Sequence, residues 1–218
     1  ITGTGNAVFR DCTIRDSRSI GVAASGENAR CTFERCDIYG HRKCLVEVTR
    51  GAGPRLLQCS LRQGGGVGLF VGGGAKPVID NCTVAACKSA GIRCGTGGDP
   101  VVRGCKVRGN EGDGIVSDSA GSSGPSAVAA GGAAGAAGAG HGGGCCHGTF
   151  ENNEIEDNLG AGMRVLAGSN PSVSANLVAR NCAAGLHVSE RGGGLFKENR
   201  IQGHAGEDGG VCCEAGCT

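Results

Sequence analysis

Residues 150–201 read FENNEIEDNLGAGMRVLAGSNPSVSANLVARNCAAGLHVSERGGGLFKENRI, and this stretch decides the fold. In it, an Asn stands two residues before an aliphatic side chain at three places. These places are Asn153-x-Ile155, Asn176-x-Val178 and Asn199-x-Ile201. Successive Asn positions differ by 23 residues in the numbering. An internal repeat of this length is typical of solenoids, in which each repeat packs only on its neighbours.

The same pattern continues toward the N-terminus with Cys in place of Asn. These positions are Cys12, Cys36, Cys59, Cys82 and Cys105. We call the eight Asn and Cys positions the repeat marks. Their spacing is 23 or 24 residues, except between Cys105 and Asn153, where one repeat carries extra residues.

Two further columns of residues stand at fixed distances from the marks. Three residues before each mark stands an apolar side chain: Phe9, Phe33, Leu56, Ile79, Val102, Phe150, Val173 and Phe196. Nine and ten residues after most marks stand a Gly and an aliphatic residue, as in Gly91-Ile92 and Gly162-Met163. Three short apolar spots separated by turn residues predict three short strands per repeat and no helix. We therefore expect an all-β, right-handed parallel β-helix of about eight 23-residue coils, forming one domain over residues 1–218.

The composition fits this architecture and excludes several classes of partner. The chain has 45 Gly among 218 residues, a net charge of +1 and only 3% aromatic residues. A nucleic-acid surface needs clustered positive charge and often aromatic faces for base stacking, so no nucleic-acid partner is expected. The apolar runs are too short to span a bilayer, so no membrane partner is expected either.

The repeat marks predict an internal ladder. An inward Asn can bond the Asn one coil away, and a small thiol can pack at the same position. We prefer this packing interpretation to a metal or redox array. The chain has an odd number of cysteines, fifteen, and the five at the repeat marks are too regularly spaced to resemble a disulfide framework, which predicts a reducing compartment, cytoplasmic or nuclear.

Two other cysteine clusters are alternatives for a soft metal. One is Cys145-Cys146-His147 with His141, and the other is Cys212-Cys213 with Cys217 and His204. Neither has the paired C-x-x-C spacing of a dependable zinc site, so we expect no metal and no cofactor.

Residues 118–147 form a Gly- and Ala-rich insertion. Such a stretch buries too little apolar surface to order itself, so we expect a disordered loop at one edge of the solenoid. Neither end of the sequence resembles a cap for the open strand edges, so we expect the chain to be part of a longer solenoid.

A family resemblance rests on residues 148–171 and 185–201, with Ser169-Asn170-Pro171 alternating with a coil that reads GGLFKENRI. These repeats resemble those of F-box only protein 11 and its relatives. The resemblance implies a protein-binding β-helix similar to the substrate-recognition region of a ubiquitin-ligase adaptor, with a protein as partner and a glycan as the second candidate. Similar repeats occur in carbohydrate-binding and sugar-hydrolase domains and in alginate epimerases, so the pattern specifies fold better than activity.

The enzyme alternative is an extracellular carbohydrate-binding or polysaccharide-modifying protein: a lyase, epimerase or hydrolase. The outward column eleven residues after the marks reads Ala23, Glu47, Phe70, Arg93, Val116, Arg164, His187 and, displaced by two residues in the last repeat, Cys212. A hydrolase needs two carboxylates and a calcium-dependent lyase needs several, whereas this column offers one. We therefore expect no catalysis.

The charged members of this column are the candidate binding residues: Glu47, Arg93, Arg164 and His187. Arg164 and His187 should be neighbours on one face. The alternative is that these residues are an ordinary solvated surface.

Overall fold

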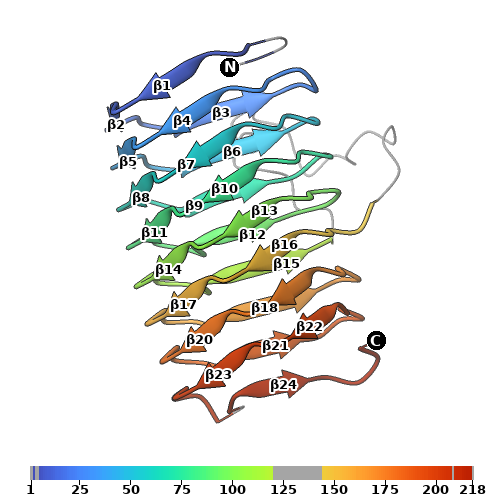
Figure 1. The fold of residues 1–218 in the computed structure, drawn as a ribbon. Coiled ribbons are helices and arrows are strands. Elements are labelled where there is room, and N and C mark those ends of the chain that lie inside the picture. The colour runs from blue at the N-terminus through green and yellow to red at the C-terminus, as the bar shows by residue number, and fades with distance from the viewer. Residues whose placement is uncertain (1, 3–4, 120–143, 208, 218) are drawn as a thin grey trace.

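The computed structural model describes residues 2, 5–119, 144–207 and 209–217, and in this part of the chain every element is a β-strand. Three strands form each coil, and eight coils stack from the N-terminus to the C-terminus (Figure 1). Equivalent strands pair in parallel and in register, so the coils build three eight-stranded sheets. The predicted all-β parallel β-helix is confirmed.

We name each sheet after its first strand. The β1 sheet contains β1 (Val8–Arg10), β4 (Thr32–Glu34), β7 (Arg55–Leu57), β10 (Val78–Asp80), β13 (Val101–Arg103), β16 (Thr149–Glu151), β19 (Ser172–Ser174) and β22 (Leu195–Lys197). The β2 sheet contains β2 (Thr13–Arg15), β5 (Asp37–Tyr39), β8 (Ser60–Arg62), β11 (Thr83–Ala85), β14 (Lys106–Arg108), β17 (Glu154–Glu156), β20 (Leu177–Ala179) and β23 (Arg200–Gln202). The β3 sheet contains β3 (Ile20–Ser25), β6 (Cys44–Thr49), β9 (Val67–Val71), β12 (Ile92–Cys94), β15 (Ile115–Asp118), β18 (Met163–Leu166), β21 (Leu186–Val188) and β24 (Val211–Cys213).

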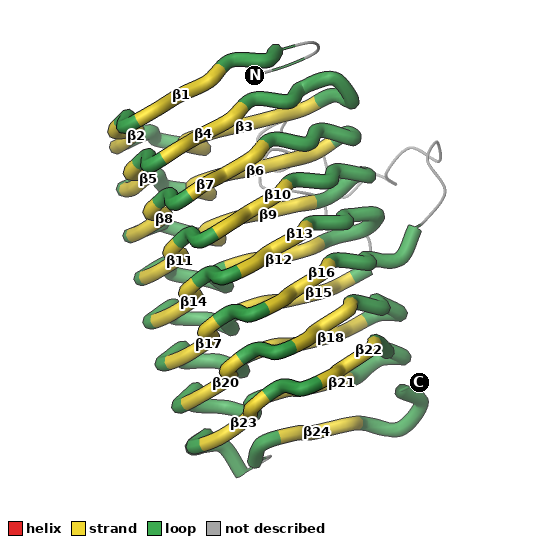
Figure 2. Tube along the Cα trace, viewed as in Figure 1, coloured by secondary structure: helices red, strands yellow, loops and turns green. Residues whose placement is uncertain are grey.

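Short loops connect the strands at the corners of each coil (Figure 2). The residue just before each mark turns the chain from the β1 sheet into the β2 sheet in a left-handed conformation, as at Arg35, Gln58 and Asn81 with φ of 52°, 53° and 52°. No helix in the described residues is long and apolar enough to cross a membrane.

Close packing between coils explains the Gly of the Gly-aliphatic pairs inside the stack, though not Gly210 in the last coil. A Cβ atom at Gly91 would lie 2.6 Å from Cγ1 of Val107 and 2.8 Å from Nδ2 of Asn110, both in the following coil. Gly114 meets the same obstacle, with its Cβ 2.9 Å from Nδ2 of Asn158. These glycines are therefore required by space rather than by turn geometry.

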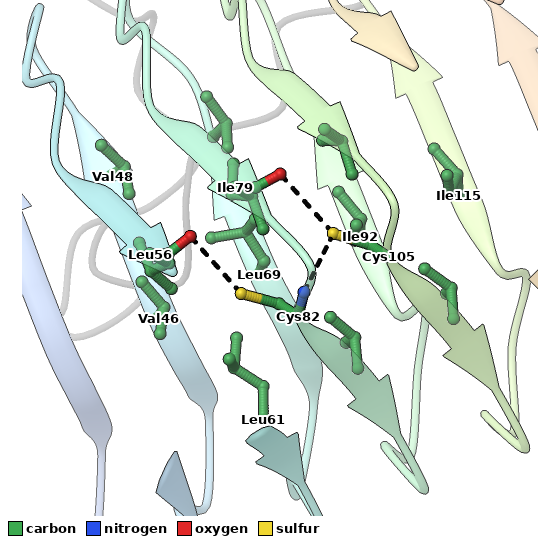
Figure 3. Close-up of a cluster of buried hydrophobic side chains, with 14 of the residues drawn as sticks. Val46, Val48, Leu56, Leu61, Leu69, Ile79, Cys82, Ile92, Cys105 and Ile115 are labelled. Carbon is green, nitrogen blue, oxygen red and sulfur yellow. Dashed lines mark hydrogen bonds between the residues drawn. The ribbon is translucent and has the colours of Figure 1, made fainter. Parts of the chain in front are cut away.

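The repeat marks form the predicted ladder inside the solenoid. Nδ2 of Asn153 donates to Oδ1 of Asn176 at 2.9 Å, and Asn176 donates to Asn199 at the same distance. In the earlier coils a cysteine sulfur is the acceptor in place of the Asn oxygen: the backbone N–H of Cys82 donates to Sγ of Cys105 at 3.4 Å (Figure 3). The packing interpretation of these thiols is confirmed, because the last four of them are buried.

The structure also contains a second ladder, five residues after the marks, that the sequence analysis missed. Nδ2 of Asn110 donates to Oδ1 of Asn158, and Nδ2 of Asn158 donates to Asn181, both at 2.9 Å. The two histidines in this column take part as acceptors: Nδ1 of His41 accepts the Ser17 N–H at 3.0 Å, and His204 does the same for Asn181.

The insertion joins β15 to β16 without separating the coils on either side, since β14 pairs with β17 and β15 with β18. Of the predicted span 118–147, Asp118 belongs to β15, and residues 144–147 return along the preceding coil, where Gly97 donates its N–H to the carbonyl of Gly144. Residues 120–143 lie outside the described part of the chain, so the predicted disorder remains a prediction.

Candidate functional site

The predicted outward column exists as a line of register partners along the β3 sheet. Arg93 pairs with Val116, Val116 with Arg164, Arg164 with His187, and His187 with Cys212. Arg164 and His187 are therefore neighbours on adjacent strands, as their spacing predicts. Arg93 lies two strands away from Arg164.

Glu47, the remaining candidate, does not lie with the others on an accessible surface. It is only 4% exposed, and Phe70, which stands between it and Arg93, is 3% exposed. The Glu47 charge instead acts on the buried thiol of Cys44, whose pKa is raised first by burial and second by this carboxylate. The accessible part of the predicted row is therefore Arg93, Arg164 and His187.

A cavity of about 230 Å³ lies between the two arginines, over β15. Two carboxylates that the sequence analysis missed line it together with Arg93 and Arg164. Arg93 Nη2 lies 2.9 Å from Oδ2 of Asp118, and Arg164 Nη2 lies 3.1 Å from Oδ1 of Asp113. Both carboxylates come from the coil that lies between the arginines, so each guanidinium is held toward this middle coil and the cavity over it.

Both arginines keep donors that are not used by these ion pairs. The Nε atoms of Arg93 and Arg164 are buried, and neither has a hydrogen-bond partner in the part of the chain that the structure describes. The side chains themselves are about one third exposed. Because a guanidinium has five N–H donors and suits planar carboxylates, each of the two positioned arginines can bind an anionic group at the edge of this cavity.

His187 lies at the other end of the accessible row. Its Nε2 is 3.0 Å from Oε1 of Glu214, which follows β24. The hydrogen bond fixes the ring and leaves Nδ1 as the nitrogen that can take a proton. A carboxylate behind an imidazole is the arrangement used to orient a general base.

Asp113, Asp118 and Glu214 were missed because only one outward column was read. Asp118 lies two residues after Val116, where strand alternation returns to the outward face, and Glu214 lies two residues after Cys212. That second outward position was the available signal. Asp113 precedes β15 and has no strand periodicity to reveal it.

The cysteines depart from the sequence expectation at one pair. Cys94 and Cys146 form a disulfide, which ties β12 to the segment that precedes β16. Cys146 is thereby removed from the proposed cluster around Cys145 and His147, while His141 lies outside the described residues. Across the described ranges, no group of three or more His, Cys, Asp or Glu side chains is placed to hold a metal ion.

Comparison with known families identifies the architecture. Residues 1–128 and 129–218 match the family described as the right handed beta helix region. The chain belongs to this family. No curated protein sequence matches the chain, and the resemblance to F-box only protein 11 finds no support.

Three solved structures share the fold. The A-module of the mannuronan C-5 epimerase AlgE4 from Azotobacter vinelandii has a TM-score of 0.67 at 12% identity, with 94% of this chain and 55% of that chain covered. The A-module of AlgE6 from the same organism has a TM-score of 0.62 at 14% identity, with 96% and 58% covered. The periplasmic alginate epimerase AlgG has a TM-score of 0.64 at 9% identity, with 93% and 49% covered. This chain thus spans about half the length of each.

These neighbours correct the expectation that the chain is not a catalyst. All three are named as epimerases of mannuronan or alginate, so this chain shares its fold with polysaccharide-modifying enzymes. The expectation rested on the single outward carboxylate, which bears only on glycoside hydrolysis and calcium-dependent elimination. A site built from arginines and a histidine supports other chemistry.

Proposed function

We propose that this chain is a polysaccharide-modifying enzyme that binds an acidic polysaccharide across β12, β15, β18 and β21. The observation that carries the proposal is the pair of arginines on either side of one cavity, each positioned by a carboxylate and about one third exposed. An acidic polysaccharide presents carboxylates that such side chains recognise. The mannuronan and alginate epimerases of the same fold support this substrate class.

The spacing of the arginines suits a polymer that runs along the solenoid axis. Arg93 and Arg164 are two strands apart, which corresponds to about 10 Å at the usual strand separation. A chain lying across the strands would therefore meet Arg93 first and Arg164 second. The arginines would bind carboxylates of different sugar units.

The chemistry that fits the site is removal of the proton next to a carboxylate. Arg164 neutralises the carboxylate of one sugar, which makes the adjacent C–H bond more acidic. His187, on the next strand, accepts this C–H proton at its Nδ1. Glu214, which is hydrogen-bonded to Nε2, stabilises the imidazolium that forms. Both an epimerase and a lyase begin with this step, and the neighbours favour the epimerase.

Binding measurements test the substrate class. Polymannuronate should bind to the wild-type protein, and neutral dextran should not. Arg93→Ala and Arg164→Ala should each weaken polymannuronate binding by about tenfold, because each removes a charge-assisted contact of about 1.5 kcal/mol. Arg108→Ala is the matched control, since Arg108 is an exposed arginine on the β2 sheet. Equal binding by all four proteins would overturn the proposal.

The proposed function also bears on the compartment. A disulfide persists in oxidising environments, so the Cys94–Cys146 bond favours an extracellular or periplasmic site of action over the cytoplasmic or nuclear location expected from the cysteine count. Alkylation of free thiols in protein taken from its native compartment distinguishes the two locations. If Cys94 is alkylated, the disulfide is absent and the compartment is a reducing one.

A further inference from the structure

The C-terminal end of the accessible row joins a thiol to the histidine and the carboxylate. Cys212 on β24 is the register partner of His187 on β21, and both residues occupy the same outward column. In-register strands about 4.8 Å apart place side chains of one column directly above one another. Cys212 is a partly exposed thiol, so small reagents can reach it.

We propose that Cys212 is a nucleophilic thiol activated by His187, and that it reacts with hydroperoxides and with soft carbon electrophiles. The arrangement is the one that activates cysteine nucleophiles elsewhere: a thiol, a histidine that takes its proton, and a third group that orients the histidine. Here Glu214 is that third group, at 3.0 Å from Nε2. Because Nε2 is engaged, Nδ1 receives the proton.

The position of β24 supports the assignment to Cys212 rather than to its neighbours. Strand alternation points Cys213 to the opposite face from Cys212 and away from the His187 column. Cys217 is directed elsewhere too, because its Sγ lies 3.2 Å from the carbonyl of Val188. Cys212 is therefore the thiol in this cluster that shares a column with a base.

The reaction with a hydroperoxide balances as follows. The thiol proton moves to His187, and the thiolate attacks the nearer peroxide oxygen. An S–O bond forms, the O–O bond breaks, and the leaving oxygen takes the proton from the imidazolium to give water or an alcohol. The sulfur is oxidised to a sulfenic acid, which a thiol reductant reverses.

Oxidation at Cys212 would regulate the row beside it. A sulfenic acid stacked on His187 is a hydrogen-bonding partner for the base and occupies space one strand from it. Peroxide should therefore lower polysaccharide turnover reversibly. This consequence rests on the proposed function, whereas the reactivity of the thiol does not.

Site-resolved alkylation tests the reactivity without any polysaccharide. Folded protein is treated with iodoacetamide at pH 7, and the labelling rates of individual cysteines are followed by mass spectrometry of peptides. Cys212 should react at least tenfold faster than Cys182, which is exposed and serves as the reference thiol. His187→Gln should reduce the Cys212 rate at least tenfold and leave Cys182 unchanged. Glu214→Gln should reduce it by a smaller factor.

A second measurement checks the oxidation. Dimedone should trap a sulfenic acid at Cys212 after brief exposure to hydrogen peroxide, and Cys212→Ser should show no such adduct. Equal rates at Cys212 and Cys182, or a Cys212 rate that is unaffected by His187→Gln in a folded variant, would overturn the proposal. Loss of polymannuronate binding would leave these outcomes unchanged, so the two proposals fail separately.

Discussion

Arg164 on β18 pairs with Asp113 in the preceding coil, with Nη2 3.1 Å from Oδ1. The same carboxylate oxygen accepts the backbone N–H of Ala161 at 2.7 Å, so it connects the segment before β15 to two residues of the following coil. Asp113 is mostly buried, with 15% of its side chain exposed. It is thus both a structural acceptor and the group that positions Arg164.

Replacement of Asp113 should separate these two roles. Asp113→Ala leaves the N–H of Ala161 and the Arg164 guanidinium without their acceptor and should lower the free energy of unfolding by about 2 kcal/mol. Asp113→Asn retains an acceptor and should cost about 1 kcal/mol. Lys197→Ala is the control, because its ion pair with Glu198 is two-thirds exposed and should contribute under about 0.5 kcal/mol. Urea unfolding measures all three, and equal losses for the two Asp113 variants would contradict the assigned roles.

The internal ladder predicts unequal costs for its amide and thiol positions. Asn176 donates to Phe150 O and Asn199 and accepts two N–H groups from Asn153. Asn176→Ala should therefore cost at least about 3 kcal/mol. Cys82→Ala removes weaker sulfur contacts and a small volume, and should cost about 1–2 kcal/mol. Thermal or urea unfolding in which Cys82→Ala is the more damaging change would show that the thiols carry the ladder.

At Gly91 we expect lack of space, rather than backbone strain, to determine how much an added side chain lowers the free energy of unfolding. Gly91→Ala would place a methyl group against Val107 and Asn110 and should cost about 3 kcal/mol. Gly109→Ala is the contrasting variant: its φ is +60°, but a Cβ there would meet nothing within 4 Å. It should cost about 1 kcal/mol, the usual penalty for a left-handed alanine. Urea unfolding measures both losses, and a larger loss for Gly109→Ala than for Gly91→Ala would contradict the explanation from lack of space.

Buried thiols predict a loss of stability at alkaline pH. Burial raises the pKa of Cys87 to about 11, whereas an unfolded thiol has a pKa of about 8.5. The folded state therefore holds the proton more tightly. Its contribution, about 3 kcal/mol, is complete below about pH 8.5 and is lost as the pH rises to about 11.

Cys87→Ser isolates this contribution, since serine does not titrate in this range. The variant should lose less unfolding free energy between pH 8 and pH 11 than the wild type does, as measured by urea unfolding at each pH. Identical losses would mean that Cys87 ionises equally in the folded and unfolded states.

The fold could be predicted from the sequence because stacking repeats the same constraint in every coil. Phe33, Leu56 and Ile79 occupy one column, and a period of 23 residues is enough to align them. The second ladder escaped detection because its column contains different residue types. Ser17, His41, Gly64 and Cys87 precede Asn110, and no single residue type marks the position.

The site was only partly predictable for a related reason. Arg164 and His187 could be placed side by side, since register follows from the repeat. Asp113 and Asp118 occur in one coil only, so the 23-residue repeat does not reveal them, and strand alternation alone gives the outward direction of Asp118. The burial of Glu47 was equally hidden, because strand alternation gives the direction of a side chain but not what covers it.

Proton exchange on polymannuronate in deuterium oxide tests the central claim most directly. If Arg164 and His187 remove the proton next to a sugar carboxylate, the wild-type protein should introduce deuterium at that carbon, detected by NMR, and Arg164→Ala and His187→Gln should reduce the rate at least a hundredfold. Arg108→Ala should retain the wild-type rate. The account is contradicted if folded wild-type protein that binds polymannuronate incorporates no deuterium, or if His187→Gln exchanges as fast as the wild type.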